Sequence, residues 1–118
     1  MSGIETELQL LRTVQVTLGS DGSGLSVPIG PDQSWERWVI ENISTSCDST
    51  ANTTLIILRQ GTLRPVEGTY SGNLDSTDTV YKLMPGERLS FQYTGGDTGA
   101  TGLITITGTK YLKGRRAY

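Results

Sequence analysis

The sequence contains few of the side chains that catalysis or metal binding requires. It has no histidine and only one cysteine, Cys47. Histidine is the commonest general base and metal ligand, and it is the usual partner of a serine or cysteine nucleophile. A zinc site needs several cysteine or histidine ligands held together. The sequence therefore predicts a protein that is not an enzyme, with no catalytic residue, no metal site and no cofactor.

Carboxylates are the remaining candidates for acid–base chemistry or cation binding. Asp75 and Asp78 lie close together in the sequence, and Asp21 and Asp97 occur in glycine-rich segments. None of them shows the regular spacing of oxygen ligands that a calcium loop has. Aspartates in such segments are typical of turns, where the carboxylate accepts hydrogen bonds from nearby backbone N–H groups. We therefore interpret these residues as turn residues.

Charged residues cluster near both ends of the chain. Residues 110–118 contain four cations and no acid, whereas two glutamates lie near the start. We predict an N-terminal arm over residues 1–7 and a basic arm over residues 110–118, because complementary charges can set the register between protein copies. A solvated, frayed tail is the alternative. The candidate subunit-interface residues are Glu5, Glu7, Lys110, Lys113, Arg115 and Arg116.

Two tryptophans are the candidate aromatic contacts. Trp35 and Trp38, with several tyrosines, would suit a platform on which sugars stack, but such residues more often belong to the core or anchor protein contacts. Nucleic acid is not an expected partner, because the net charge is −2 and duplex binding relies on a basic face. No membrane is expected either, since no segment approaches the ~20 apolar residues that span a bilayer.

Size and composition predict a single domain over residues 1–118. Apolar residues make up 35% of the chain, and they are clustered rather than dispersed. One cysteine excludes an intrachain disulfide, so the fold must depend on packing. We expect no secretory leader at the start of the chain and synthesis in a reducing cytoplasm.

Alternating apolar and polar residues predict β-strands along most of the chain. Leu89, Phe91 and Tyr93 share one face of a strand, and a glycine-rich loop then leads to a second strand with Ile104 and Ile106 inside. The expected strands cover residues 7–18, 25–29, 34–44, 55–58, 79–84, 87–93 and 103–108, with an extended connection over residues 61–78. The segments near residues 4–11 and 34–44 also have helical spacing. The pattern predicts an all-β fold, an antiparallel β-sandwich or jelly-roll-like barrel of about seven or eight strands.

Three segments resemble small virion proteins of tailed bacteriophages, especially those that infect actinobacteria. They are residues 68–78, residues 83–100 with Gly86-Glu-Arg-Leu89 and Tyr93-Thr-Gly-Gly-Asp97, and the closing strand at residues 103–108. The resemblance covers about residues 35–109. In these proteins the position of Tyr93 is often tryptophan.

The resemblance implies a structural role in a virion. Such proteins decorate capsids, or lie at the neck or along the tail, usually as symmetric oligomers. It implies a capsid decoration or cement protein whose partners are the major capsid protein or tail and neck subunits, located in the virion after synthesis in the host bacterial cytoplasm. The alternatives are a tail or neck accessory protein of the virion, and a carbohydrate-binding β-sandwich for host attachment.

Overall fold

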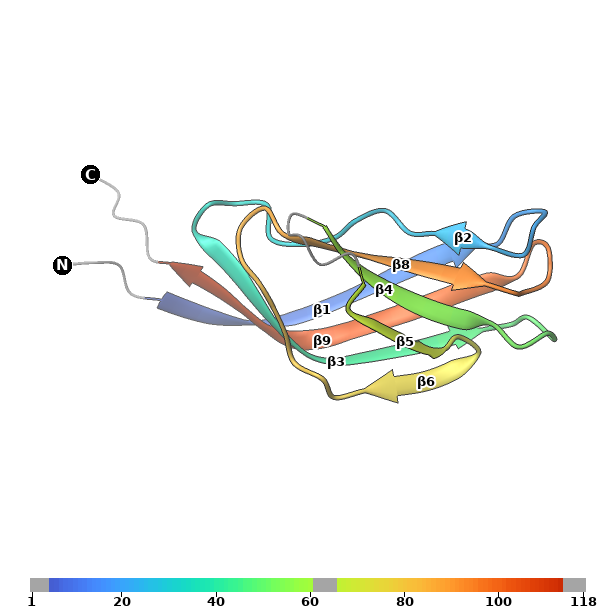
Figure 1. Ribbon diagram of the computed structural model, residues 1–118. Helices are drawn as coiled ribbons and strands as arrows, with labels where there is room; N and C mark the ends of the chain where they lie inside the picture. The colour runs from blue at the N-terminus through green and yellow to red at the C-terminus, as the bar shows by residue number, and fades with distance from the viewer. Residues whose placement is uncertain (1–4, 61–65, 114–118) are drawn as a thin grey trace.

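The computed structural model describes residues 5–60 and 66–113. These residues form nine β-strands and no helix. No helix that could cross a membrane is found in this part of the chain. Two antiparallel sheets pack against each other (Figure 1). The strands are β1 (Glu5–Thr17), β2 (Gly24–Leu25), β3 (Glu36–Cys47), β4 (Thr54–Gln60), β5 (Gly68–Ser71), β6 (Leu74–Thr77), β7 (Tyr81–Leu83), β8 (Arg88–Thr94) and β9 (Thr101–Lys113). The predicted all-β sandwich is confirmed.

In the described residues, sheet A has five strands and sheet B has four. Sheet A has the order β1-β9-β3-β6, with β7 also paired to β3, and sheet B has the order β2-β8-β4-β5. Strands β8 and β9 follow each other in sequence but belong to different sheets, so the glycine-rich loop between them crosses from one layer to the other. Gly95 and Gly99 have φ values of 79° and 80°, a conformation that side chains disfavour.

The apolar residues that alternate with polar ones in the sequence form the core between the two sheets. The fully buried apolar residues of sheet B include Leu55, Ile57, Leu89 and Phe91, and those of sheet A include Ile40, Leu83, Ile104 and Ile106. Tyr93 also lies in this core, where its hydroxyl group hydrogen-bonds to Thr45. Gly102 faces the Tyr93 ring so closely that a Cβ atom would lie 2.3 Å from it.

Some strand boundaries differ from the prediction. Residues 68–78, predicted as an extended connection, contain β5 and β6, and their neighbours β4 and β3 supply the hydrogen bonds that these short polar strands need. The strand predicted at residues 25–29 is reduced to β2 and a bridge from Ile29 to Leu89, because Pro28 has no N–H group to donate. Residues 61–65 of the predicted connection lie outside the described residues.

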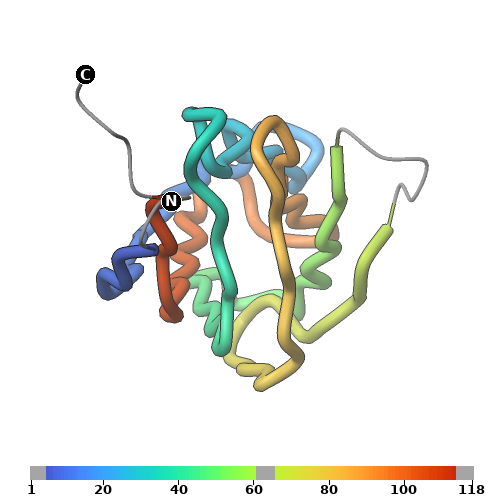
Figure 2. Tube along the Cα trace, turned by 90° about the vertical axis from the view of Figure 1, so that its left-hand side faces the viewer, coloured from blue at the N-terminus to red at the C-terminus, as the bar shows by residue number. Residues whose placement is uncertain are grey.

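Three strands of sheet A extend past sheet B toward the chain ends (Figure 1). We call this part the terminal ribbon: residues 5–11 of β1, 36–40 of β3 and 107–113 of β9. Figure 2, viewed from this end, shows the two layers behind it. The ribbon contributes to an elongated molecule of 55 × 23 × 21 Å.

A β-bulge in β3 separates the ribbon from the rest of sheet A. The register between β3 and β9 shifts between Ile40 and Asn42. Gly108 lies opposite this bulge, and a Cβ atom there would lie 2.1 Å from the carbonyl oxygen of Val39. Residues 5–7 and 111–113, which we predicted to belong to terminal arms, pair with each other in the β1–β9 ladder, and Lys110 pairs with Leu8. The rest of both predicted arms lies outside the described residues.

Candidate subunit-interface site

An arginine joins the strands of the terminal ribbon. The Nε and Nη2 atoms of Arg37 donate hydrogen bonds of 3.1 Å each to the two carboxylate oxygens of Glu5. The guanidinium carbon lies 4.1 Å from the centre of the Tyr111 ring. These hydrogen bonds to the Glu5 carboxylate raise the pKa of Arg37 above its ordinary value. Arg37 on β3 thus holds Tyr111 on β9 and Glu5 on β1, so the three strands present a fixed charged surface.

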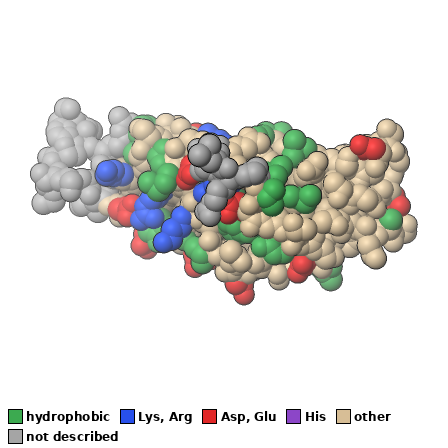
Figure 3. All heavy atoms as spheres, viewed as in Figure 1, with side chains coloured by type: hydrophobic (Ala, Val, Ile, Leu, Met, Phe, Trp, Pro, Cys, Tyr) green, Lys and Arg blue, Asp and Glu red, His purple; other side chains and the backbone are tan. Residues whose placement is uncertain are grey.

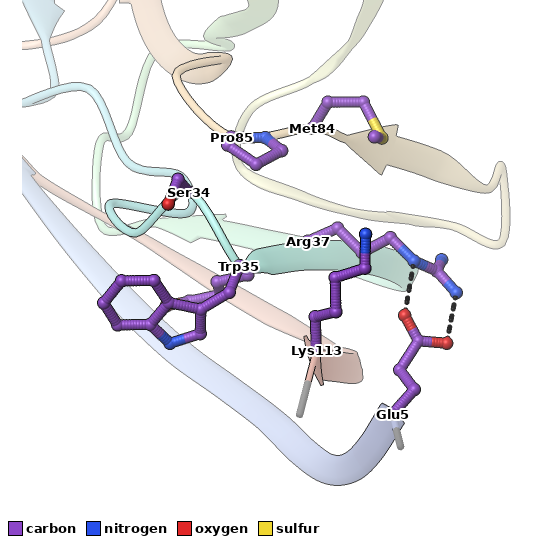
Figure 4. Close-up of a pocket in the computed structure, with 8 residues that line it drawn as sticks. Glu5, Ser34, Trp35, Arg37, Met84, Pro85 and Lys113 are labelled. Carbon is purple, nitrogen blue, oxygen red and sulfur yellow. Dashed lines mark hydrogen bonds and ion pairs between the residues drawn. The ribbon is translucent and has the colours of Figure 1, made fainter. Parts of the chain in front are cut away.

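A pocket lies between this surface and the turn after β7 (Figure 4). Its volume is about 210 Å³. Two acidic and two basic side chains lie beside apolar ones, so the pocket offers both hydrogen-bonding groups and apolar contact. The lining residues are Glu5, Ser34, Trp35, Glu36, Arg37, Met84, Pro85 and Lys113. This composition suits a polar ligand or a side chain of a partner protein.

The opposite face of the ribbon contains the second tryptophan. Trp38 is only 2% exposed, its Nε1 atom donates a hydrogen bond of 2.6 Å to Glu36, and the guanidinium carbon of Arg12 lies 5.5 Å from its ring centre. Lys110 lies opposite Trp38 in the β3–β9 register. Because Lys110 and Lys113 are three residues apart on one strand, their side chains point to opposite faces.

The structure brings some of the predicted site residues together and separates others. Glu5, Lys113 and Trp35 line the same pocket, and Glu7 lies opposite Tyr111 in the β1–β9 register. Lys110 and Trp38 lie on the other face of the ribbon. Arg115 and Arg116 lie outside the described residues.

The two central residues of the charged surface were missed by sequence analysis, as were Ser34, Glu36, Met84 and Pro85 of the pocket. Arg37 and Tyr111 form the centre of the charged surface, yet neither was a candidate. A signal existed for Tyr111, because it is two residues from Lys113 and residues at this spacing share one face of a strand.

Charge is distributed unevenly along the molecule. In the view of Figure 3, the lysine and arginine side chains lie toward the left, which is the side of the terminal ribbon, and the right half is mostly uncharged.

The aspartates singled out in the sequence accept hydrogen bonds, Asp21 within a turn but Asp78 from the distant side chain of Asn42. Asp75 accepts hydrogen bonds from the backbone of Ser76 at 2.8 Å and Ser71 at 3.1 Å. Hydrogen bonds from Ser23 lower the pKa of Asp21, and hydrogen bonds from Thr50 lower that of Asp97. In the part of the chain that the structure describes, no group of three or more acidic, histidine or cysteine residues is placed to hold a metal ion.

Comparisons with known proteins show the fold of the chain. No family model matches the sequence, and no curated protein is significantly similar to it. A chain from the endospore appendages of Bacillus, described as disulfide-linked pili, has 15% identity over 94% of this chain and 92% of its own length, with a TM-score of 0.53. A chain from the acid-stable capsid of Helicobacter pylori bacteriophage KHP30 has 10% identity over 92% and 93%, with a TM-score of 0.53.

A third similarity is weaker. The N-terminal cellulose-binding domain of a Cellulomonas fimi glucanase has 10% identity and a TM-score of 0.34, over 86% of this chain and 90% of its own. This score is too low to support an argument. The first two comparisons, with their low identities, show a shared β-sandwich fold that covers nearly all of this chain.

Proposed function

We propose that this protein is a non-enzymatic structural component of a tailed-phage virion, a capsid decoration or cement protein that binds neighbouring capsid subunits. The terminal ribbon is the observation that carries this proposal. It extends beyond the second layer of the sandwich and presents the fixed surface of Glu5, Arg37 and Tyr111. The fold shared with chains of a phage capsid and of a pilus, both repetitive assemblies, supports it.

In this function the sandwich is a rigid body and the chain ends make the contacts. Lys113 is exposed at the end of β9, and Arg115 and Arg116 follow it in sequence. These three cations engage acidic patches on an adjacent capsid or tail subunit. Many copies in a symmetric particle multiply such contacts, so each one can be weak while the assembly is firm.

Charge reversal tests this contact. Replacing Lys113, Arg115 and Arg116 together by glutamate should reduce the amount of the protein in purified particles, measured by quantitative mass spectrometry. The circular dichroism spectrum of the isolated variant should remain unchanged. Lys82→Glu, an exposed cation on β7, is the control for a single Lys113→Glu change. Equal incorporation of the triple variant and the unchanged protein would refute the contact.

The copy number in the particle tests the location. A decoration protein follows the capsid lattice and should be present in hundreds of copies, whereas a neck or tail-tip accessory protein would be present in about a dozen or fewer. Mass spectrometry of purified virions against labelled standard peptides measures this number. A low copy number would favour the tail or neck alternative, and absence from virions would refute both.

The pocket beside Trp35 favours a second candidate function, carbohydrate binding for host attachment. A sugar would place its ring against the indole and its hydroxyl groups near the pocket's charged side chains. Trp35→Ala should then abolish binding on a glycan array. Trp38→Ala is the contrasting variant, because Trp38 is buried and its replacement should lower stability. An array on which the unchanged protein binds no glycan would refute this candidate.

A further inference from the structure

Strand β1 has one edge paired with β9 and one edge open. The β1–β9 register runs without interruption from Glu5 opposite Lys113 to Thr17 opposite Thr101. Just beyond it, the Leu18 N–H donates to the Ala100 carbonyl at 2.8 Å. Bonded and non-bonded pairs alternate in an antiparallel ladder, so the even-numbered residues of β1 bond to β9.

The odd-numbered residues of β1 therefore direct their N–H and C=O groups away from the sheet. Within the described residues, no backbone or side-chain hydrogen bond to these groups is found from Glu5 to Gln15. Only the end of the strand is covered, since a Cβ atom on Gly24 of β2 would lie 2.9 Å from the Thr17 carbonyl oxygen. The open edge is longer than most whole strands.

This edge lacks several of the features that usually prevent pairing with another chain. Residues 5–17 contain no proline, glycine or lysine, and the β1–β9 ladder has no bulge. Leu8 and Leu11 lie on opposite faces of the strand and are 43% and 59% exposed. The charge of Arg12 lies over the ring of Trp38, on one face of the ribbon. Such an edge is a template for another strand.

We propose that β1 pairs antiparallel with β1 of a second copy of this chain, so that the two A sheets become one continuous sheet. The inference depends on the edge geometry and charge pattern of β1, and it does not depend on the virion role. A two-fold axis relates the two copies, which gives a closed dimer.

The charges on β1 determine the orientation. Glu5 and Glu7 both lie at the start of the strand. A parallel partner would place the four carboxylates side by side, at strand spacings of about 5 Å, where like charges repel. An antiparallel partner places them opposite the uncharged end of the strand instead. Charge therefore favours the antiparallel pair.

The direction of the free backbone groups limits the register. Odd-numbered residues must form the hydrogen-bonded pairs, and a two-fold axis at Leu11 satisfies this condition. Leu11 then faces its own copy on one face of the sheet, and Leu8 faces Val14 on the other, so the exposed leucines become covered. Glu7 faces Gln15 in this register.

Two variants should weaken the dimer without disturbing the monomer. Thr13→Pro removes an N–H group that points to the partner and leaves the β9 ladder intact, and Thr13→Val is its control because it keeps this donor. Leu11→Arg places two like charges at the axis. By sedimentation velocity at several concentrations, the unchanged protein and Thr13→Val should dimerise, and both other variants should raise the dissociation constant at least about tenfold. Unchanged circular dichroism confirms folding.

Cross-linking tests the register. In a Cys47→Ser background, Leu11→Cys should form a disulfide-linked dimer under mild oxidation. Thr105→Cys is the control, because it lies on the same face but on β9, one strand further from the axis. A monomeric unchanged protein, a dimer insensitive to both edge variants, or equal cross-linking at both positions would overturn the proposal. Incorporation into virions is measured separately, so either proposal can fail alone.

Discussion

We call the part of the sandwich in which sheet B packs on sheet A the covered half. The covered half and the terminal ribbon are held together by different interactions. In the covered half, Ile57 and Phe91 of sheet B are completely buried against sheet A. In the ribbon, Arg37 is held by Glu5 and Tyr111 at the surface. Burial of apolar area stabilises folding far more than exposed ion pairs do. Leu10, Trp38 and Ile40 on the inner face of the ribbon are also buried in the core. The buried interior should therefore determine stability, and the exposed outer face of the ribbon is free to serve recognition.

A single backbone irregularity marks where one region ends and the other begins. The bulge between Ile40 and Asn42 changes the register of β3 against β9. At Gly108 of β9 the backbones of the two strands lie so close that a side chain would clash with the Val39 carbonyl oxygen. Bulges bend a strand and increase its twist. Here the bend lies where β3 leaves the cover of sheet B, so the ribbon can differ from the covered half without breaking the sheet.

The largest expected effect comes from truncating the core of the covered half. Phe91→Ala should lower the free energy of unfolding by about 3–5 kcal/mol, because it removes a fully buried ring and leaves a cavity. Leu8→Ala in the ribbon, where the leucine is 43% exposed, should cost about 1 kcal/mol or less. Urea unfolding followed by tryptophan fluorescence measures both. Similar losses would mean that the two regions contribute equally to stability.

A methyl group at the boundary should have the next largest effect. In Gly108→Ala the new Cβ atom would lie 2.1 Å from the Val39 carbonyl oxygen, so the backbones of β3 and β9 must separate. We expect a loss of about 1–3 kcal/mol in unfolding free energy and faster amide exchange over residues 36–40. Hydrogen exchange with mass spectrometry measures the second effect.

The control for this prediction is Gly19→Ala, at a turn where the nearest atom would be 3.6 Å from the new Cβ. It should leave exchange in the ribbon unchanged. If Gly108→Ala accelerates exchange in both halves to the same extent, the bulge is not a boundary.

Tyr93 gives the covered half a stability that depends on pH. Burial raises the pKa of its hydroxyl group above the ordinary value of 10, and the hydrogen bond to Thr45 opposes this shift in part. The folded state therefore resists ionisation, so the stabilisation is complete below pH 10 and is lost as the pH rises through the folded pKa. Burial also raises the pKa of Tyr81.

Tyr93→Phe should reveal this contribution. Removal of the hydroxyl group should cost about 1–2 kcal/mol at pH 7, because Thr45 then loses its buried partner. Above pH 10 the variant should lose stability less steeply with pH than the unchanged protein does. Urea unfolding at a series of pH values measures the slope. Equal slopes for the two proteins would show that Tyr93 does not limit alkaline stability.

The sequence predicted the covered half better than the ribbon. Alternation identified the inner face of Leu89, Phe91 and Tyr93, because burial on one face of a strand imposes a period of two. The same rule found Ile104 and Ile106 on the inner face of β9. Strands β5 and β6 escaped prediction, since their side chains are polar and their partners come from distant segments.

The candidate site was predicted only in part, because it depends on which strands become neighbours. Charge near both chain ends indicated Glu5 and Lys113, and the structure places both at one pocket. Arg37 was missed, since nothing in its own segment shows that β3 lies beside β9 and two strands from β1. Pairing of distant strands must be known before such a surface can be recognised.

The smallest expected effect comes from breaking the ion pair of the ribbon. Glu5→Gln keeps the size of the side chain but removes the charge that Arg37 binds through two hydrogen bonds. Both groups are exposed, so water replaces the lost interaction and the urea midpoint should not change measurably. Exchange of the amides of residues 36–40 should nevertheless become faster, because Arg37 then holds β9 through Tyr111 but no longer holds β1.

Glu7→Gln is the matched control for this variant. Glu7 lies on the same strand face and its charge also acts on Arg37, but the hydrogen bonds of Arg37 go to Glu5, so replacing Glu7 should change exchange in the ribbon less than Glu5→Gln does. High salt should reduce the difference between the unchanged protein and Glu5→Gln, since it screens exposed charges. A fall of the urea midpoint for Glu5→Gln comparable to that for Phe91→Ala would place both regions in one cooperative unit. In that case the ribbon would be as necessary for folding as the core is, and its charged surface could not be varied independently for recognition.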